Sequence, residues 1–158
     1  MGRPTRATSS VVAVVLLVGV AVLTAALVGS ATLAATPDGA VDVSRVRLAA
    51  SADATTDRVT LTHRGGDTLA VDDLRVVVSV DGQRLAYQPP VPFFAARGFR
   101  AGPTGPFNVA TDDRWRAGET AGFRVAGTNS PGIDSGSQVR VVLYRGESRV
   151  GMVETRAG

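Results

Sequence analysis

Near its N-terminus the chain carries a long segment without a single charged residue. No charge lies between Ala7 and Pro37, and the 18 residues 11–28 are apolar except for Gly19 and Thr24. A stretch of this length can cross a bilayer as a helix. A helix over residues 8–35 would measure about 42 Å at 1.5 Å per residue, which exceeds the roughly 30 Å of the hydrocarbon core. Part of such a helix must tilt, protrude or be buried elsewhere.

The charges in front of this segment predict its orientation. Arg3 and Arg6 precede it without any acidic residue, and the positive-inside rule then places the N-terminus in the cytoplasm and residues from Asp38 onward outside. A secretory signal peptide cut near Ala35 is one interpretation, although its apolar part should be only about 7 to 15 residues long. A plain transmembrane anchor is another. A third is a prepilin-type signal, in which a short basic leader is removed and the helix stays on the mature protein.

The helix itself is apolar on every side, which indicates complete burial in lipid or in a protein assembly. Small residues recur in it at intervals of four, at Ala21, Ala25 and Gly29. This spacing lets helix backbones approach closely, so we expect these three residues to pack against a neighbouring helix. Chance is the competing explanation, because alanine, glycine and valine dominate the segment.

Composition excludes several kinds of chemistry. The chain has no cysteine and one histidine, which rules out disulfides, thiolate metal sites and sites with several histidines. Its formal net charge is +3, and every basic side chain other than His63 is an arginine. The sequence lacks the dense basic patch of a nucleic-acid binder. His63 stands beside a glycine turn, and no nucleophilic serine motif or phosphate-binding loop is present. We therefore expect a protein that is not an enzyme, needs no cofactor or metal, and binds no nucleic acid.

Residues 36–44 form a hinge that leads into a first strand, since Thr36-Pro37-Asp38-Gly39 interrupts helix and strand alike. The outer domain is expected to cover residues 38–158, and its apolar residues alternate with a period of two. The pattern predicts an antiparallel β-sandwich of about seven strands. The expected strands cover residues 41–48, 59–63, 76–80, 84–87, 122–126, 138–144 and 148–155, with turns at 63–67, 81–82 and 145–146.

The interval 88–108 is rich in proline and holds four of the five phenylalanines. They are Phe93, Phe94, Phe99 and Phe107. Proline excludes a central strand here, and long irregular loops in compact domains are often functional. The loop could present its rings as a subunit or adhesion surface, or it could fold back over one end of the core. We favour the second interpretation because apolar rings are mostly buried.

Residues 6–18, RATSSVVAVVLLV, resemble the start of archaeal type IV pilins, particularly the haloarchaeal ones. The matching positions are the basic residue, the small residue before the cut and the first mature residue: Arg6, Ala7 and Thr8. Ser10 and Ala13 replace the proline and glycine that are usual in the family. The resemblance implies a leader at 1–7, a hydrophobic helix at 8–35, cleavage by a prepilin peptidase, and assembly with other copies and other pilins.

Together these features predict a pilin-like structural subunit of an extracellular filament that serves surface adhesion. It would be found in the cell membrane with its C-terminal domain outside, or in the extracellular pilus. The alternative is a membrane-anchored extracellular β-sandwich binding module that does not polymerise. Removal of the leader and assembly of subunits distinguish the two.

Overall fold

The structure, a computed structural model, describes residues 14–15 and 46–158. The chain divides into two units, Met1–Ala40 and Val41–Gly158. Val14 and Val15 have helical backbone and are exposed. The remaining residues of the expected leader, helix and hinge, up to residue 45, lie outside the described residues. Within the described part of the chain, no helix is both long and apolar enough to cross a membrane.

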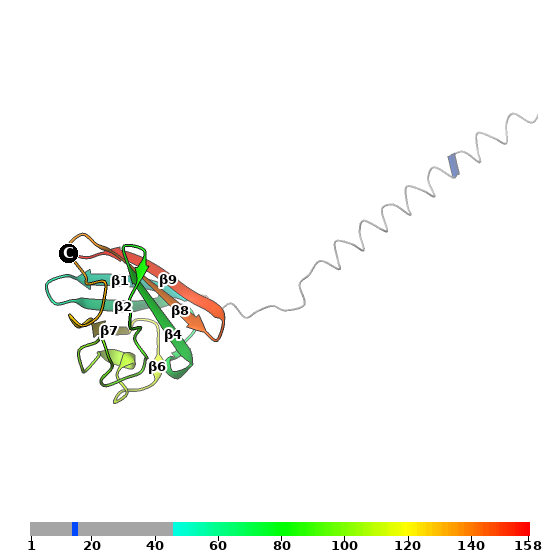
Figure 1. Cartoon of the computed structure of the whole chain (residues 1–158). Coiled ribbons are helices and arrows are strands. Elements are labelled where there is room, and N and C mark those ends of the chain that lie inside the picture. The colour runs from blue at the N-terminus through cyan, green and yellow to red at the C-terminus, as the bar shows by residue number, and fades with distance from the viewer. Residues whose placement is uncertain (1–13, 16–45) are drawn as a thin grey trace, which may run out of the picture. The chain divides into compact units, whose positions relative to one another are not determined.

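Residues 46–158 form a mainly β domain built from antiparallel sheets (Figure 1). The strands are β1 (Arg47–Asp53), β2 (Arg58–Gly65), β3 (Leu69–Ala70), β4 (Leu74–Val80), β5 (Gln83–Arg84), β6 (Arg114–Trp115), β7 (Thr120–Arg124), β8 (Gln138–Arg145) and β9 (Ser148–Arg156). Two short 3-10 turns, η1 (Val71–Asp73) and η2 (Gly105–Phe107), interrupt them. One sheet has the order β1-β2-β7, a second β5-β4-β8-β9, and β3 pairs with β6.

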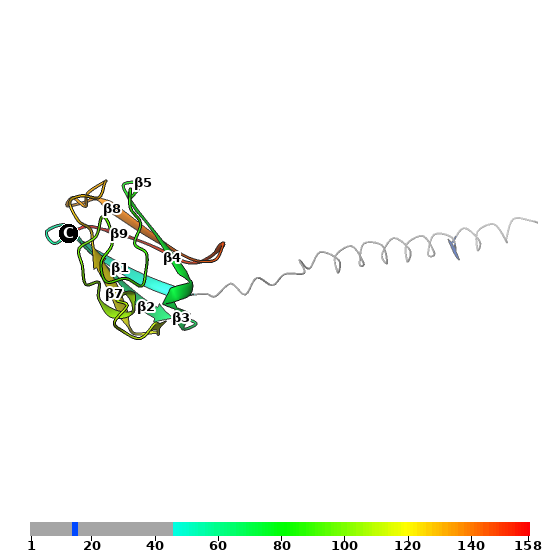
Figure 2. The same ribbon diagram turned by 60° about the horizontal axis from the view of Figure 1, so that its bottom comes forward.

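The two larger sheets bury their inner faces in one hydrophobic core. Figure 2 shows β4, β5 and β8 on one side of the domain and β2 and β7 on the other. Alternate residues of the long strands β2, β4 and β8 enter the core, because successive side chains of a strand point to opposite faces. The largest fully buried side chains are Trp115, Phe107 and Phe123. Within β2 the buried residues are Val59, Leu61 and His63, as the alternation predicts.

The strands expected at 59–63, 76–80, 138–144 and 148–155 are confirmed, each with a shift of a few residues at its ends. The hairpin turn expected at 81–82 is also confirmed, with positive φ angles of 49° and 82° at Asp81 and Gly82. The first strand was expected at 41–48, and this prediction was wrong at its C-terminal end, because β1 continues to Asp53. Its small residues carry little apolar signal, yet they pair in register with β2, as Ala50 does with Leu61.

The strand expected at 84–87 was also wrong in extent, since β5 ends at Arg84. Beyond it a side chain occupies the edge of β4 instead of a strand. The side-chain carbonyl of Gln88 accepts a hydrogen bond from the Val78 N–H (2.7 Å), and its amide group donates to the Val78 carbonyl (3.0 Å). The Val78 carbonyl also accepts the Leu85 N–H (3.1 Å), so Gln88 and the Leu85 backbone together satisfy the polar groups of Val78.

Other segments cover the remaining edges of the two large sheets. The chain before η2 runs along β7, where Thr104 and Gly122 exchange two backbone hydrogen bonds of 2.8 and 3.1 Å. At the other edge of the same sheet, β1 contacts the end of the chain: the Gly158 N–H donates to the Ala52 carbonyl (3.1 Å). These contacts protect sheet edges that could otherwise pair with another chain.

Candidate functional site

The phenylalanine-rich loop 88–108 mostly covers the core. Phe93, Phe99 and Phe107 are buried. Phe99 meets Phe123 edge-on with ring centroids 5.5 Å apart, and Phe107 meets Trp115 at 5.2 Å. These three rings act in packing and are not presented to a partner.

Phe94 is the exception in this loop, with 60% of its surface exposed. Phe93 and Asn108 form a parallel bridge, and Phe94 and Val109 are the residues that directly follow them in the two segments. Val109 is also 60% exposed, and its N–H donates to the Phe93 carbonyl (3.3 Å). Of the four phenylalanines predicted as a possible interaction surface, Phe94 alone is exposed, and Val109 just beyond the loop is exposed as well.

His63 has a structural environment. It is fully buried in β2, and its ring lies edge-on to Trp115 with centroids 5.7 Å apart. The Gly65 N–H donates to Nδ1 (3.3 Å), which assigns the proton to Nε2, and Nε2 donates to the Asp67 carbonyl (2.9 Å). Both ring nitrogens are therefore occupied within the domain.

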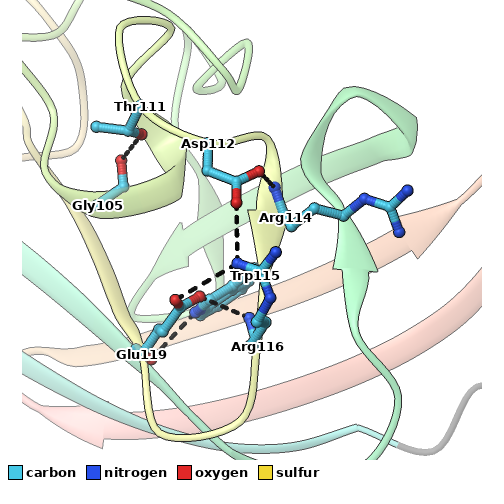
Figure 3. A network of polar contacts seen from close by, with 7 residues as sticks. All are labelled: Gly105, Thr111, Asp112, Arg114, Trp115, Arg116 and Glu119. Carbon is cyan, nitrogen blue, oxygen red and sulfur yellow. Dashed lines mark hydrogen bonds and ion pairs between the residues drawn. The ribbon is translucent and has the colours of Figure 1, made fainter.

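A polar network surrounds Arg116, in the loop between β6 and β7 (Figure 3). The Arg116 guanidinium lies 2.9 Å from the Asp112 carboxylate and 3.8 Å from that of Glu119. Glu119 also accepts the Arg116 backbone N–H (2.7 Å), and Asp112 accepts that of Arg114 (3.0 Å). The Arg114 N–H, followed by the Arg116 side chain, lowers the pKa of the Asp112 carboxyl. Asp112 is thereby held as an ionised partner of Arg116.

Beside this network lies an open pocket of about 400 Å³, lined by Gly105, Thr111, Asp112, Gly118 and Glu119 among others. The Thr111 hydroxyl donates to the Gly105 carbonyl (2.7 Å), and Figure 3 shows the Arg114 side chain pointing away from both acids. The pocket carboxylates are engaged by Arg116, so the arrangement is suited to fixing the loop rather than to acid–base chemistry. Sequence analysis missed it, although Asp112 and Glu119 stand four residues before and three after Arg116.

The expected processing residues Arg6, Ala7 and Thr8 and the expected packing residues Ala21, Ala25 and Gly29 lie outside the described residues. In the described part of the chain, no group of three histidine, aspartate or glutamate side chains is placed to hold a metal ion. No protein-family model matches the chain, and comparison with curated proteins found no match.

Proposed function

We propose that the chain is a pilin-like structural subunit of an extracellular type IV pilus-type filament. The proposal is carried by one observation, the Arg6-Ala7 step directly before an uncharged segment that continues to Pro37. A mainly β domain with its own core follows that segment, which suits a domain displayed outside the cell. In this proposal the domain is a β-sandwich and the chain serves surface adhesion.

In the proposed pathway a prepilin peptidase cuts between Ala7 and Thr8, and the helix over residues 8–35 holds the chain in the membrane until assembly. The helices of neighbouring subunits then pack together in the filament core. Ala21, Ala25 and Gly29 would allow close approach of backbones, so that contacts between helices replace contacts with lipid.

A second candidate is a membrane-anchored binding module that does not polymerise. Phe94 and Val109 favour it, because both are large, exposed apolar side chains that directly follow the bridged residues Phe93 and Asn108 and are accessible to a partner. In this case the leader would remain on the protein or serve only as an anchor, and the domain would act singly.

The decisive test replaces a residue of the small row in the full chain, expressed together with a pilus assembly machinery. Ala25→Leu adds bulk where backbones would approach most closely, which costs roughly 1–3 kcal/mol in a packed interior. The same change is harmless to a lone helix in lipid, where leucine is favourable. We expect membrane insertion to persist while surface filaments, counted by immunogold electron microscopy, disappear.

Val22→Leu is the control, since it adds one carbon on another face of the helix, against three for Ala25→Leu, and should leave filaments in place. Filaments that survive Ala25→Leu would show that the small row is only compositional. Absence of filaments for the unmodified chain would favour the tethered module instead.

A further inference from the structure

The outer face of the sheet β5-β4-β8-β9 combines an apolar row with arginines. Strand register places three cross-strand rows on this face, away from the core. They are Arg75, Tyr144 and Arg149; Val77, Val142 and Met152; and Ser79, Arg140 and Glu154. In the apolar row, Met152 is 50% exposed, Val142 is half-buried and Val77 is buried. Arg84 joins the third row opposite Ser79, and Arg156 lies opposite Gln138.

This face carries a strong positive charge. The residues that the register places on this face include five arginines and one acid, Glu154, a formal charge of +4. Asp81, in the turn between β4 and β5, lies near Arg156 at the edge of the face. Residues 46–158 as a whole hold 14 arginines and 12 acids, a formal charge of +2. The rest of the domain is therefore negative, at −2.

Three of these arginines already have a partner within the domain. Arg156 donates to the Gly136 carbonyl (3.3 Å). Arg140 pairs with Glu154. Arg75 lies over the Tyr144 ring, 4.3 Å from its centroid. Among the described residues, Arg75, Arg84 and Arg149 form no ion pair. Arginine forks of this kind bind carboxylates well.

The compensating negative charge is gathered on two segments that β3 and β6 bring together. Residues 67–73 and 112–119 contain six acids and two arginines, a formal charge of −4. Pairing of Leu69 with Trp115 joins the segments, and the Val71 N–H donates to the Asp113 carbonyl (2.8 Å). We call this the acidic surface. Its exposed acids include Asp72, Asp73, Asp112 and Asp113.

We propose that the arginine-bearing face docks on the acidic surface of a second copy of this chain. The two formal charges match in size and are opposite in sign, and the apolar row supplies a dry centre for the contact. In this contact one surface of each copy meets a different surface of the next, so it is head-to-tail and can repeat along an open filament. The inference rests on the proposed function, because an assembled filament supplies the local concentration that a weak contact needs.

Cysteine cross-linking tests this contact without background, because the chain has no cysteine. Met152→Cys places a thiol on the arginine-bearing face, and Ala117→Cys places one in the loop of the acidic surface. Neither substitution changes a charge. The full chain carrying both, treated with a short thiol cross-linker on cells, should give a ladder of dimers, trimers and larger species. Each single variant should stay monomeric, and the two single variants together should give dimers only.

Charge reversal in the same double-cysteine variant tests whether the contact depends on opposite charges. Arg75→Glu with Arg149→Glu should reduce cross-linked trimers at least about ten-fold, because like charges are then opposed. Asp72→Arg with Asp73→Arg should do the same, and all four changes together should restore the ladder. The matched control is Arg97→Glu with Arg100→Glu, which reverses two charges outside both surfaces and should leave the ladder unchanged.

The remaining outcomes separate this contact from the filament function. Filaments without a ladder overturn the contact and leave the function standing, whereas a ladder without filaments supports the contact and overturns the function. Dimers of a single-cysteine variant indicate a symmetric contact and overturn the proposal. Binding of the full chain to alginate beads that depends on Arg75 and Arg149, without a ladder, assigns the face to an acidic polysaccharide and also overturns it.

Discussion

At the scale of single residues, side-chain amides replace backbone pairing in the long loop. Asn129 is only 6% exposed. Its carbonyl accepts the Tyr87 N–H (3.0 Å), and its amide group donates to the carbonyls of Tyr87 (2.9 Å) and Gly98 (3.2 Å). Asn129 therefore ties together segments that are 31 and 42 residues away in the sequence.

Replacing Asn129 by alanine would leave the Tyr87 backbone groups without these partners in a site that water barely reaches. We expect Asn129→Ala to lower the free energy of unfolding by about 1–3 kcal/mol, measured by urea titration. Thr128→Ala changes the exposed neighbour and should stay within about 0.5 kcal/mol of the unmodified protein. Equal effects of the two substitutions would contradict the role assigned to Asn129.

Three exposed aspartates predict how stability depends on pH. Hydrogen bonds from Thr56 to Asp53, from the Gln138 N–H to Asp81 and from the Arg114 N–H to Asp112 lower the pKa of each carboxyl below 3.8. A lowered folded-state pKa means that the stabilisation is present above the unfolded value and is lost as the pH falls through the folded value. Thermal melting should therefore be insensitive to pH above about 5 and fall below about 4.

The variant with Asp53, Asp81 and Asp112 all replaced by asparagine should lose much of this acid sensitivity. A second variant with Asp72, Asp73 and Asp134 replaced by asparagine removes the same charge from exposed positions whose side chains make no hydrogen bond in the described structure. It should keep the original profile. Melting curves by circular dichroism between pH 7 and 2.5 compare them, and identical profiles would refute the assignment.

At the scale of elements, sequence predicted the strands whose two faces differ in polarity. β2 and β4 alternate buried and accessible residues over most of their length, so a period of two was visible. β3 and β6 have two residues each, too few to show any period. The segment along β7 was also hidden, because its pairing with Gly122 depends on backbone contact across the loop.

That segment supplies a sharp prediction at Gly105, the first residue of η2. Gly105 has a φ of +61°, and an added Cβ would collide with the Thr120 carbonyl oxygen of β7. Gly118 has a φ of +93° but open space around it. Alanine is strained at both positions because of the positive φ, so the difference in stability between the two variants reports the collision at residue 105. Gly105→Ala should be less stable than Gly118→Ala by about 1–3 kcal/mol in urea titrations. Equal stability would show that the segment does not pack against β7.

At the scale of the whole molecule, the division into an apolar N-terminal segment and a β-rich remainder could be predicted from the sequence. The sequence also favoured burial of the loop phenylalanines, which holds for Phe93, Phe99 and Phe107. The Arg116 network is local, and the spacing of Asp112 and Glu119 around Arg116 was its only signal in the sequence. The separation of charge between two surfaces could not be foreseen, because it arises from residues that are distant in sequence and meet only when β3 pairs with β6 and β4 with β8.

The central claim is that the processed chain itself builds the filament. The most direct measurement is the intact mass of the chain in surface filaments sheared from cells that express it with a pilus machinery. The proposed function predicts that the chain is abundant in this fraction and begins at Thr8. A chain found only in the membrane with its leader intact, or a secreted chain that begins near residue 36, would contradict it.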